Sequence, residues 1–494
     1  MKLENLLNNL KVKKVINLKK DLQIDYVSDN SNNVKPNTIF ISLSGTNTSG
    51  DIFLQEAINN GAKAVVIETE KLGLNVTQIV VENTRIALSI ISANFFDNPQ
   101  NSLKFISVVG TNGKTSTTHI MANILKTAKK AVGIIGTNGI YINEQKLDND
   151  MTTPDPLVLF KILKQMKDAH IKYVVMEVSA HAIYFNKVYG IKNECIIFTN
   201  FSQDHLDFFK TMENYKNVKL SYFNSKYTKS LVTNVDDNLG KEILLKTNLP
   251  VITYGIKNPS DIFAVNISMN LEGCSFVVNN LDDVYQIKSN LSCLFNVYNI
   301  LACIGACNML GISKSVIKKA LLQIKGIAGR FNLVKHKQNF NIIIDYAHTP
   351  ESLKNLLVNV KSLTKSKIIT VFGCPGNRDE LKREIMGNIA GEFSDYVILT
   401  SDNPQFENSY RIMRNIEVGV IKSKCPYKLI DDRREAISLA LSLATCKSTI
   451  IIAGKGIEDY QNINGEHIPY SDYTEVINQL TLAKSLKLDN KFLY

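Results

Sequence analysis

The chain has 494 residues, 45% of them hydrophobic and 21% charged, a balance typical of a globular protein of about three domains. No apolar run approaches the roughly 18–20 residues of a membrane span, and the eight cysteines lack C-x-x-C spacing, so we expect a cytoplasmic protein without a transmembrane helix, zinc site or disulfide framework. The net charge of +11 favours anionic ligands such as nucleotides, whereas dispersed lysines and the absence of tryptophan argue against nucleic-acid binding.

Residues 1–98 form the first section of the chain. Three short strand-like runs, TIFISL, AKAVVIE and QIVVE, alternate there with helical segments. The section ends in DNPQNS, a cluster of turn-forming residues that marks a boundary. The pattern therefore predicts a small N-terminal α/β domain.

Residues 99–328 and 329–494 each alternate short apolar strands with helices. The strands include FISVV, AVGIIG, YVVME and CIIFTN in the second section, and FNIIID, KIITVF, YVILT and STIIIA in the third. These unbroken, β-branched runs are typical of strands buried on both faces of a parallel sheet. Their alternation with helices predicts doubly wound α/β units in both sections.

Polar motifs follow the carboxyl ends of these strands. They are GTNGKT, EVSAH, TNFSQDHLD, DYAHTP, GCPGNRD, TSDNP and GKGIED. Ligands of doubly wound sheets bind at that edge. Together the motifs indicate ligand binding there more strongly than any one of them alone.

The motif GTNGKT has the features of a phosphate-binding loop. Its glycines let backbone N–H groups approach phosphate, and the N-terminus of the following helix favours negative charge. Lys114 would contact the β- and γ-phosphates, and Thr115 would coordinate magnesium. A structural turn is the alternative, because Val108 stands where the full G-x-x-x-x-G-K-[ST] pattern has its first glycine.

Glu177 and His205 each follow another strand of the second section. A carboxylate beside the γ-phosphate suits magnesium, which prefers hard oxygen ligands. Imidazole is a less usual magnesium ligand. On its own, His205 therefore fits a structural hydrogen-bonding role, and Asp204 or Asp207 could supply a ligand instead.

The order of these motifs, together with TTP (152–154), NVYN (296–299) and GR (329–330), resembles the Mur ligase family. Within it, the set is similar to the MurE type, which adds the third amino acid of the peptidoglycan stem peptide. The resemblance covers nearly the whole chain. It implies three α/β domains: a smaller UDP-sugar-binding domain (1–98), a central P-loop ATPase with a mostly parallel sheet (99–328), and a Rossmann-like amino-acid-binding domain (329–494).

The resemblance implies an ADP-forming acid–amino-acid ligase that uses ATP and two magnesium ions. It also implies that Lys219 is carbamylated, which would turn a cation into a carboxylate-like metal ligand. The implied catalytic residues are Lys114, Glu177, His205 and Lys219, and the implied metal ligands are Thr115, Glu177, His205 and Lys219. The implied ATP-binding residues are Gly110, Thr111, Asn112, Gly113, Lys114, Thr115, Ser116, Asn296, Arg330 and Asp345.

In the implied reaction, the carboxylate of UDP-N-acetylmuramoyl-L-alanyl-D-glutamate attacks the γ-phosphate of ATP and forms an acyl phosphate. The amine of a diamino acid then displaces phosphate. The enzyme would be a cytoplasmic monomer of peptidoglycan synthesis. The residues implied to contact its two substrates are Ser31, Thr152, Thr153, Ser179, Lys187, Arg383, Asp402, Asn403, Gln405, Gly454 and Glu458.

Gln405 is the main departure from the family pattern. Relatives that add meso-diaminopimelate usually have arginine here, in DNPR, where it pairs with the distal carboxylate. Glutamine donates hydrogen bonds but carries no charge, so meso-diaminopimelate and L-lysine both remain open. Asn32, Asp51 and Ile457 also depart from the family's usual residues.

Two other functions remain open. A paralogous Mur-type ligase would use the same chemistry with another amino acid or acceptor, and the departures fit that alternative. A nucleotide-gated binding protein derived from a ligase is disfavoured, because binding alone has little need for the metal-site residues Glu177, His205 and Lys219.

Overall fold

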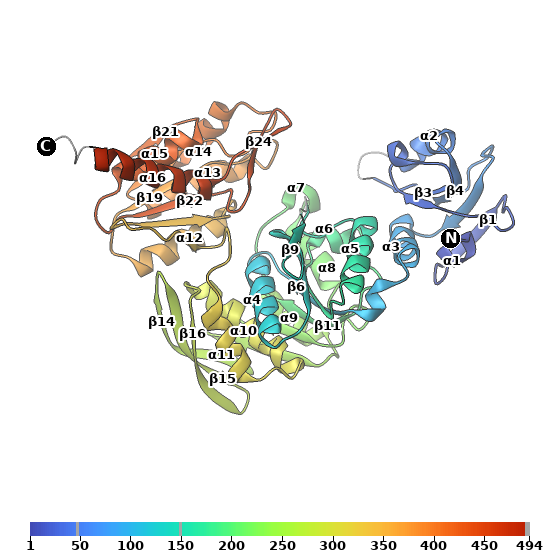
Figure 1. Cartoon of the computed structure of the whole chain (residues 1–494), viewed down its shortest axis with the longest axis horizontal. Helices are drawn as coiled ribbons and strands as arrows, with labels where there is room; N and C mark the ends of the chain where they lie inside the picture. The colour runs from blue at the N-terminus through green and yellow to red at the C-terminus, as the bar shows by residue number, and fades with distance from the viewer. Residues whose placement is uncertain (46–48, 148–150, 490–494) are drawn as a thin grey trace.

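The computed structural model describes residues 1–45, 49–147 and 151–489. Its strands form three main sheets that follow one another along the chain. The N-terminal part lies at one end of the long axis and the C-terminal part at the other, with the central part between them (Figure 1). The central part therefore stands next to both of the others.

The N-terminal part is a five-stranded sheet in the order β1-β5-β4-β3-β2. Only the pairing of β1 with β5 is antiparallel. The continuous apolar runs predicted as strands form β3, β4 and β5, which are almost wholly buried. The strands are β1 (Val12–Ile16), β2 (Tyr26–Ser28), β3 (Thr38–Ile41), β4 (Ala62–Ile67) and β5 (Thr77–Val81). The helices are α1 (Leu3–Leu6), η1 (Ser31–Asn33), η2 (Gly50–Phe53), α2 (Leu54–Asn59), α3 (Thr84–Phe95) and η3 (Pro99–Ser102).

The central part is an eleven-stranded sheet in the order β16-β15-β14-β13-β12-β11-β6-β10-β7-β8-β9. Its middle, from β14 to β7, is parallel. The strands are β6 (Lys104–Val109), β7 (Val132–Gly136), β8 (Gly139–Ile142), β9 (Gln145–Leu147), β10 (Tyr173–Glu177), β11 (Asn193–Phe198), β12 (Leu231–Asn234), β13 (Val251–Gly255), β14 (Ile262–Asn270), β15 (Gly273–Asn280) and β16 (Asp283–Ser289). The helices are α4 (Lys114–Thr127), α5 (Pro156–Asp168), α6 (Ala180–Tyr184), α7 (Leu206–Phe209), α8 (Met212–Leu220), α9 (Asn238–Lys246), α10 (Leu294–Met309) and α11 (Lys314–Gln323).

Both edges of the central sheet are antiparallel, which the sequence did not predict. β14, β15 and β16 form a meander on one edge, and β7, β8 and β9 form one on the other. Burial alternates along β16, with every second residue exposed. Such alternation is expected of a strand with one solvated face, so these strands lack the continuous apolar runs of the parallel middle.

The C-terminal part is a six-stranded sheet in the order β17-β18-β22-β19-β20-β21, with a separate hairpin of β23 and β24. All of its pairings are parallel except that of β17 with β18. The strands are β17 (Asn332–Leu333), β18 (Asn341–Asp345), β19 (Ile368–Phe372), β20 (Tyr396–Leu399), β21 (Tyr427–Leu429), β22 (Thr449–Ala453), β23 (Tyr460–Ile463) and β24 (Glu466–Pro469). The helices are α12 (Pro350–Leu363), α13 (Leu381–Phe393), α14 (Ser409–Ser423), α15 (Arg433–Leu443) and α16 (Asp472–Asp489).

The polar motifs stand at strand ends, as the sequence predicted. GTNGKT, EVSAH and TNFSQDHLD follow or include the last residues of β6, β10 and β11 in the central sheet. DYAHTP, GCPGNRD, TSDNP and GKGIED do so for β18, β19, β20 and β22 in the C-terminal sheet. Because these strands are parallel within each sheet, each group of loops shares one sheet edge.

The cysteines do not pair with one another. All eight lie within the described ranges, and none forms a disulfide. Seven are buried, and Cys446, in the loop between α15 and β22, is exposed. Among the described helices, none has the length and apolarity that crossing a membrane requires.

Candidate active site

The phosphate loop lies between β6 and α4. Gly113 has a φ of +84°, in the region that favours glycine, and the helix begins at the next residue, Lys114. A Cβ on Gly110 would lie 1.9 Å from Thr199 Oγ1. Glycine at this position therefore lets the loop pass close to the end of β11.

Asn200, just after β11, fixes the backbone of this loop. Its carbonyl accepts the N–H of Thr111 at 2.9 Å, and its Oδ1 accepts the N–H of Asn112 at 2.9 Å. Lys114 donates to the carbonyls of Gly110 and Thr111 at 2.9 and 2.8 Å, and burial lowers the pKa of its ammonium. The cation is thus held at the helix N-terminus, where phosphate binds most readily.

Glu177 ends β10 and lies beside the first turn of α4. It is 1% exposed, and its Oε2 accepts the hydroxyl of Thr115 at 3.1 Å. Thr137, just after β7, donates its N–H to Oε1 at 3.0 Å and its hydroxyl to Oε2 at 3.2 Å. The C-terminal part supplies Arg330, whose Nη2 donates to Thr115 Oγ1 at 3.1 Å. A hydroxyl and a carboxylate are therefore together, and both are the hard oxygen donors that magnesium prefers.

The other residues predicted to bind ATP lie around this centre. Ser116 is buried in the first turn of α4. Asn296, in α10, accepts a hydrogen bond from Asn299 at 3.1 Å, and Asn299 accepts one from Thr117 at 3.2 Å, which connects α10 to α4. Asp345 ends β18, and its burial raises the pKa of its carboxyl group.

Lys219 is buried inside the central part. Its side chain, in the last turn of α8, is 1% exposed, and Nζ lies 4.8 Å from the centroid of the Tyr215 ring. No hydrogen bond or ion pair of this ammonium is found within the described ranges. Burial, followed by the charge of Lys114, sets its pKa well below the ordinary value. An uncharged amine is the form of lysine that acts as a nucleophile, so the environment of Lys219 suits carbamylation.

His205 lies in the loop between β11 and α7. Its Nε2 is 3.3 Å from Asp204 Oδ2, and its ring lies edge-on to His181 at 4.9 Å between centroids. Burial lowers the pKa of the imidazole. No group of three or more His, Cys, Asp or Glu side chains that could hold a metal is found in the described part of the chain. Oxygen atoms of phosphate and water would have to complete a magnesium site here, as is usual for this ion.

Three residues predicted to hold the UDP-linked substrate connect to Glu177. Thr153 Oγ1 donates to the Glu177 carbonyl at 2.9 Å and accepts the N–H of Ser179 at 3.1 Å. Ser179 caps α6 by accepting the N–H of residue 182. Thr152 Oγ1 lies 3.0 Å from Thr137 Oγ1. These side chains form a continuous polar path that ends beside the phosphate loop.

Lys187 and Ser31 lie farther along the predicted substrate path. Lys187 follows α6, and its Nζ is 2.7 Å from Asp155 Oδ1. Ser31 is buried at the start of η1 in the N-terminal part, where its carbonyl accepts a hydrogen bond from Asn60. Within the described ranges, no hydrogen bond joins Ser31 to the other predicted site residues.

The loops after β20 and β22 meet in the C-terminal part. Asn403 Nδ2 donates to Glu458 Oε2 at 2.8 Å, and Lys455 Nζ donates to both residues, at 2.9 Å to Asn403 and 2.8 Å to Glu458. Gly454 has a φ of +113°, and a Cβ there would lie 2.4 Å from Asp402 Oδ2. The predicted residues of this part are therefore close together.

Gln405 and Arg383 have contrasting positions. Gln405, with a φ of +53°, is fixed by the β23–β24 hairpin: its N–H donates to the carbonyl of Asn462 at 3.0 Å, and its carbonyl accepts the N–H of Asn464 at 2.6 Å. Arg383 is fully buried and paired with Glu407 at 3.0 Å. Arg383 does not line the cavity into which Gln405 faces.

A cavity of about 920 Å³, which we call the shared cavity, is lined from both the central and the C-terminal parts. It brings together six predicted residues: His205, Asp402, Asn403, Gln405, Gly454 and Glu458. It also has lining residues that were not predicted, among them His348, Arg378, Tyr460 and Asn462. The motifs DYAHTP and GNRD contained a signal for the first two, whereas Tyr460 and Asn462 stand on a hairpin without a motif.

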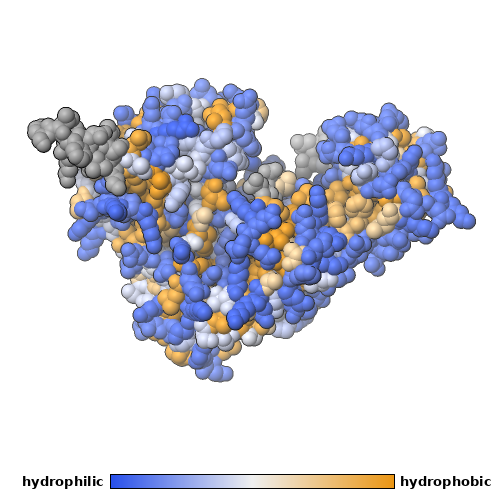
Figure 2. Space-filling model, viewed as in Figure 1, coloured by the Kyte–Doolittle hydropathy of each residue, from blue (hydrophilic) through white to orange (hydrophobic). Residues whose placement is uncertain are grey.

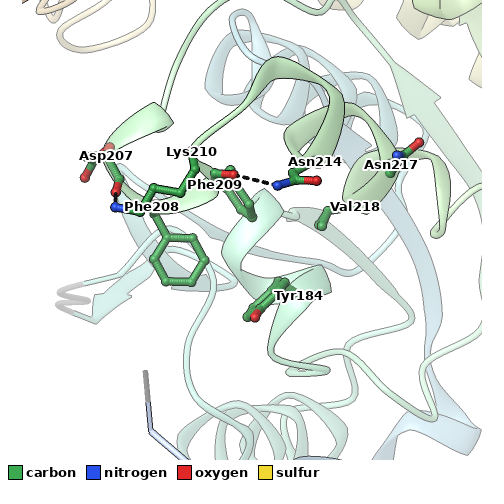
Figure 3. A pocket seen from close by; sticks show the side chains of 8 residues that line it. All are labelled: Tyr184, Asp207, Phe208, Phe209, Lys210, Asn214, Asn217 and Val218. Carbon is green, nitrogen blue, oxygen red and sulfur yellow. Dashed lines mark hydrogen bonds between the residues drawn. The ribbon is translucent and has the colours of Figure 1, made fainter. Parts of the chain in front are cut away.

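A second cavity, of about 600 Å³, lies beside α7 and α8. Figure 3 shows Tyr184, Phe208 and Phe209 around this space, with the Asp207 carbonyl accepting a hydrogen bond from Lys210 at 2.6 Å. Asp207 lines both cavities. The wall of the second cavity combines these three aromatic side chains with polar and charged ones, and it contains none of the predicted site residues.

Two family models match the chain. The Mur ligase middle domain matches residues 108–307, and the Mur ligase glutamate ligase domain matches residues 329–456. A UDP-N-acetylmuramoyl-L-alanyl-D-glutamate–2,6-diaminopimelate ligase from Clostridium tetani is 41% identical over 97% of this chain and 99% of its own length. The ligase of the same name from Alkaliphilus oremlandii is 40% identical over 98% of this chain and 100% of its own length.

A solved structure of a ligase with that same name is also similar. It has a TM-score of 0.70 and 27% identity, and the match covers 98% of this chain and 99% of that chain. The likeness therefore extends over all three sheets.

Proposed function

This chain belongs to the Mur ligase family, whose members are ATP-dependent, ADP-forming ligases, and from that we propose that it joins 2,6-diaminopimelate to UDP-N-acetylmuramoyl-L-alanyl-D-glutamate. The two curated relatives are named for that reaction. One observation carries the proposal. The shared cavity joins Asp204 and His205, near the phosphate loop, to Asp402, Asn403 and Glu458 in the C-terminal part.

The first step brings two anions together, the substrate carboxylate and the γ-phosphate of ATP. Lys114 and Arg330 supply positive charge next to Thr115, where the phosphate loop meets the C-terminal part. Magnesium, held by Thr115 and Glu177, would supply more. Charge of this kind stabilises the transferring phosphoryl group and favours an acyl phosphate.

A carbamate on Lys219 would add a carboxylate-like oxygen donor near His205. The support is local: a buried amine with a strongly lowered pKa and no anionic partner within the described ranges. Without modification, the charged form of this side chain would be desolvated, and only Coulomb interactions with Asp204 and Asp237 would offset that cost. We therefore propose that Lys219 is carbamylated and that it serves a second magnesium ion together with His205.

Diaminopimelate is the amino acid we propose, although Gln405 replaces the usual arginine. The distal carboxylate needs a cation, and Arg378, from the loop after β19, lines the shared cavity. Asn403, Gly454 and Glu458 also line this cavity, and we propose that they contact the α-amino and α-carboxylate groups. Arg378 can form the bidentate pair with a carboxylate that Gln405 cannot.

Further proposals concern the whole chain. We propose domain limits of 1–98, 99–328 and 329–494, supported by one main sheet within each range. We propose a monomer acting in peptidoglycan synthesis in the cytoplasm, without nucleic acid. The substrate roles of Ser31, Thr152, Thr153, Ser179, Lys187, Arg383, Asp402, Asn403, Gln405, Gly454 and Glu458 are likewise proposals.

Phosphate release tests the proposed function directly. With ATP, magnesium and UDP-N-acetylmuramoyl-L-alanyl-D-glutamate present, we expect release to depend on an added amino acid and to be fastest with meso-diaminopimelate. Arg378→Ala should raise the KM for diaminopimelate by on the order of tenfold, the loss of one charge-assisted pair, and should leave the KM for L-lysine unchanged.

Two variants control that experiment. Lys114→Ala should abolish release, whereas Lys126→Ala, a surface lysine on the same helix, should retain wild-type activity. Faster release with L-lysine would contradict the assigned amino acid but not the ligase. No stimulation by any diamino acid would contradict the proposed acceptor and favour a paralogous ligase.

A further inference from the structure

His348 is held in a rigid turn between β18 and α12. The carboxylate of Asp345, just before the turn, accepts the backbone N–H of Phe331 at 2.6 Å and of Ala347 at 2.8 Å. On the other side, Thr349 caps α12 in a reciprocal pair with Ser352. Such fixed flanks limit where the imidazole can point, and His348 lines the shared cavity.

The hydrogen bonds of His348 fix its tautomer. Nδ1 lies 2.8 Å from the carbonyl oxygen of Tyr346. A carbonyl oxygen only accepts hydrogen bonds, so Nδ1 carries the proton. The lone pair of the neutral ring is therefore on Nε2, which has no hydrogen-bond partner within the described ranges.

The neutral form of this ring is favoured by its surroundings. Burial, followed by the charge of Lys382, lowers the pKa of His348, and Asp204 and Arg330 act on it in opposite directions. Lys382 also donates to the His348 carbonyl at 3.0 Å, so this cation is fixed beside the turn. At neutral pH the imidazole is available to accept a proton.

The second half of the proposed reaction needs such an acceptor. When an amine attacks an acyl phosphate, its nitrogen becomes positively charged and must lose a proton before the amide is complete. Two other candidate bases of the shared cavity are less suited. Glu458 is engaged by Asn403 and Lys455, and His205 stands beside Asp204 at the proposed magnesium site.

We propose that Nε2 of His348 is the general base for amide formation, a role that rests on the proposed function. The bond between the amine nitrogen and the acyl carbon forms, and the bond from that carbon to the phosphate oxygen breaks. Its electron pair leaves with phosphate. The proton passes from the nitrogen to Nε2, and the imidazolium then returns it to water.

Substitution by asparagine separates this role from a structural one. An asparagine Nδ2 can occupy the place of the histidine Nδ1 and keep the hydrogen bond to Tyr346, but it offers nothing in place of Nε2. With diaminopimelate, we expect His348→Asn to lower kcat by about 10²- to 10³-fold, the usual contribution of a general base. The KM for ATP and the thermal unfolding midpoint should stay near their wild-type values.

Hydroxylamine makes the test specific to the proton transfer. This nucleophile is largely unprotonated at neutral pH and traps acyl phosphates as hydroxamates without a base. His348→Asn should therefore form hydroxamate at a rate within about twofold of the wild-type rate, because the first step is intact. His170→Asn, an exposed histidine with a φ of +58° that asparagine also adopts, should match the wild-type enzyme in both reactions.

Two results would overturn the proposal. In the first, His348→Asn makes the amide at the wild-type kcat, so Nε2 is dispensable. In the second, hydroxamate and amide formation fall together, so the histidine acts on ATP or on phosphoryl transfer. Failure of the wild-type enzyme to form an amide with any diamino acid would instead contradict the proposed function. The experiment therefore distinguishes failure of the general-base proposal from failure of the proposed function.

Discussion

At the scale of single residues, burial lowers the pKa of Lys219, and the sequence around this lysine gives no sign of that burial. The motif around it, YKNVKLSY, is that of an ordinary amphipathic helix, and Lys216, one turn earlier, pairs with Glu213 at the surface. Lys219 instead faces Tyr215 in the interior. Burial lowers the pKa of Lys219 and so favours the uncharged amine that the proposed carbamylation requires, whereas ion pairing raises the pKa of Lys216.

The proposed carbamylation of Lys219 leads to a direct prediction. Lys219→Ala should lower kcat by on the order of 10²- to 10³-fold, as expected for a group that stabilises transition-state charge. A small carboxylate such as acetate should partly restore activity by taking the place of the carbamate. Enzyme depleted of carbon dioxide should regain activity with bicarbonate. Phosphate release measures all three effects.

Lys216→Ala is the matched control, since it removes a lysine from the same helix at the surface. It should retain full activity and should not respond to acetate. A Lys219→Ala enzyme as active as the wild type would rule out the metal-binding role.

The sequence located the residues whose positions depend on one strand alone. Lys114, Thr115 and Glu177 follow directly from strands recognisable by their apolar runs. Thr137 and His348 were not assigned, because their roles depend on which loops come into contact in the folded chain. The local sequence carries no signal for contacts between loops that are distant along the chain.

At the scale of elements, a buried ion pair supports the proposed amino-acid site in the C-terminal part. Arg433, at the start of α15, and Asp472, at the start of α16, are both 0% exposed and are joined by two hydrogen bonds of 2.7 and 2.8 Å. Arg433 also donates to the carbonyls of Ala453 at 3.0 Å and Ser401 at 3.4 Å. The next residues along the chain are Gly454 and Asp402, so the pair positions both loops.

Loss of one partner should be severe. Asp472→Ala leaves the Arg433 cation buried without its partner, and we expect the C-terminal part to lose about 3–5 kcal/mol of unfolding free energy. The double variant Arg433→Met with Asp472→Leu should recover most of that loss, because apolar groups need no partner. Urea denaturation measures both changes.

The surface pair of Lys314 and Asp283 provides the comparison. Asp283→Ala should cost less than about 1 kcal/mol, as is usual for exposed pairs. If Asp472→Ala were equally mild, the two backbone carbonyls alone would have to satisfy the Arg433 cation.

The double variant Arg433→Met with Asp472→Leu should also bind the amino acid more weakly than wild type, since the loops of Asp402 and Gly454 would no longer be fixed.

The sequence was informative about some elements and silent about others. Parallel strands such as β6 and β22 are buried on both faces, so their composition alone identified them. The meander of β14, β15 and β16 has one solvated face and was not predicted. The β23–β24 hairpin was also missed, because its four-residue strands are only partly buried or exposed.

At the scale of the whole molecule, the net charge of the chain is complementary to that of the proposed acceptor. The chain carries a net charge of +11, and hydrophilic residues cover most of the face shown in Figure 2, with smaller apolar patches between them. The proposed acceptor is an anion with a diphosphate and carboxylates. Long-range attraction between the two should raise the rate of encounter.

Salt should weaken that attraction. As ionic strength rises from about 0.01 M to about 0.15 M, the Debye length falls from about 30 Å to about 8 Å. We therefore expect kcat/KM for the UDP-linked substrate to fall by on the order of tenfold. Initial rates at constant free magnesium measure this effect.

Diaminopimelate, which carries no net charge, serves as the internal control. Its kcat/KM should change by less than about twofold over the same range. A tenfold loss for both substrates would point to weakened magnesium or ATP binding instead of slower encounter.

The single exposed thiol of Cys446 has a practical consequence. Its loop precedes β22, at the opposite end of that strand from Gly454, so a maleimide fluorophore attached there stands clear of the site. The chain contains no tryptophan, and one introduced into the central part would be the sole indole donor for energy transfer to that dye. Energy transfer between the two would then report any change in the separation of the central and C-terminal parts during turnover.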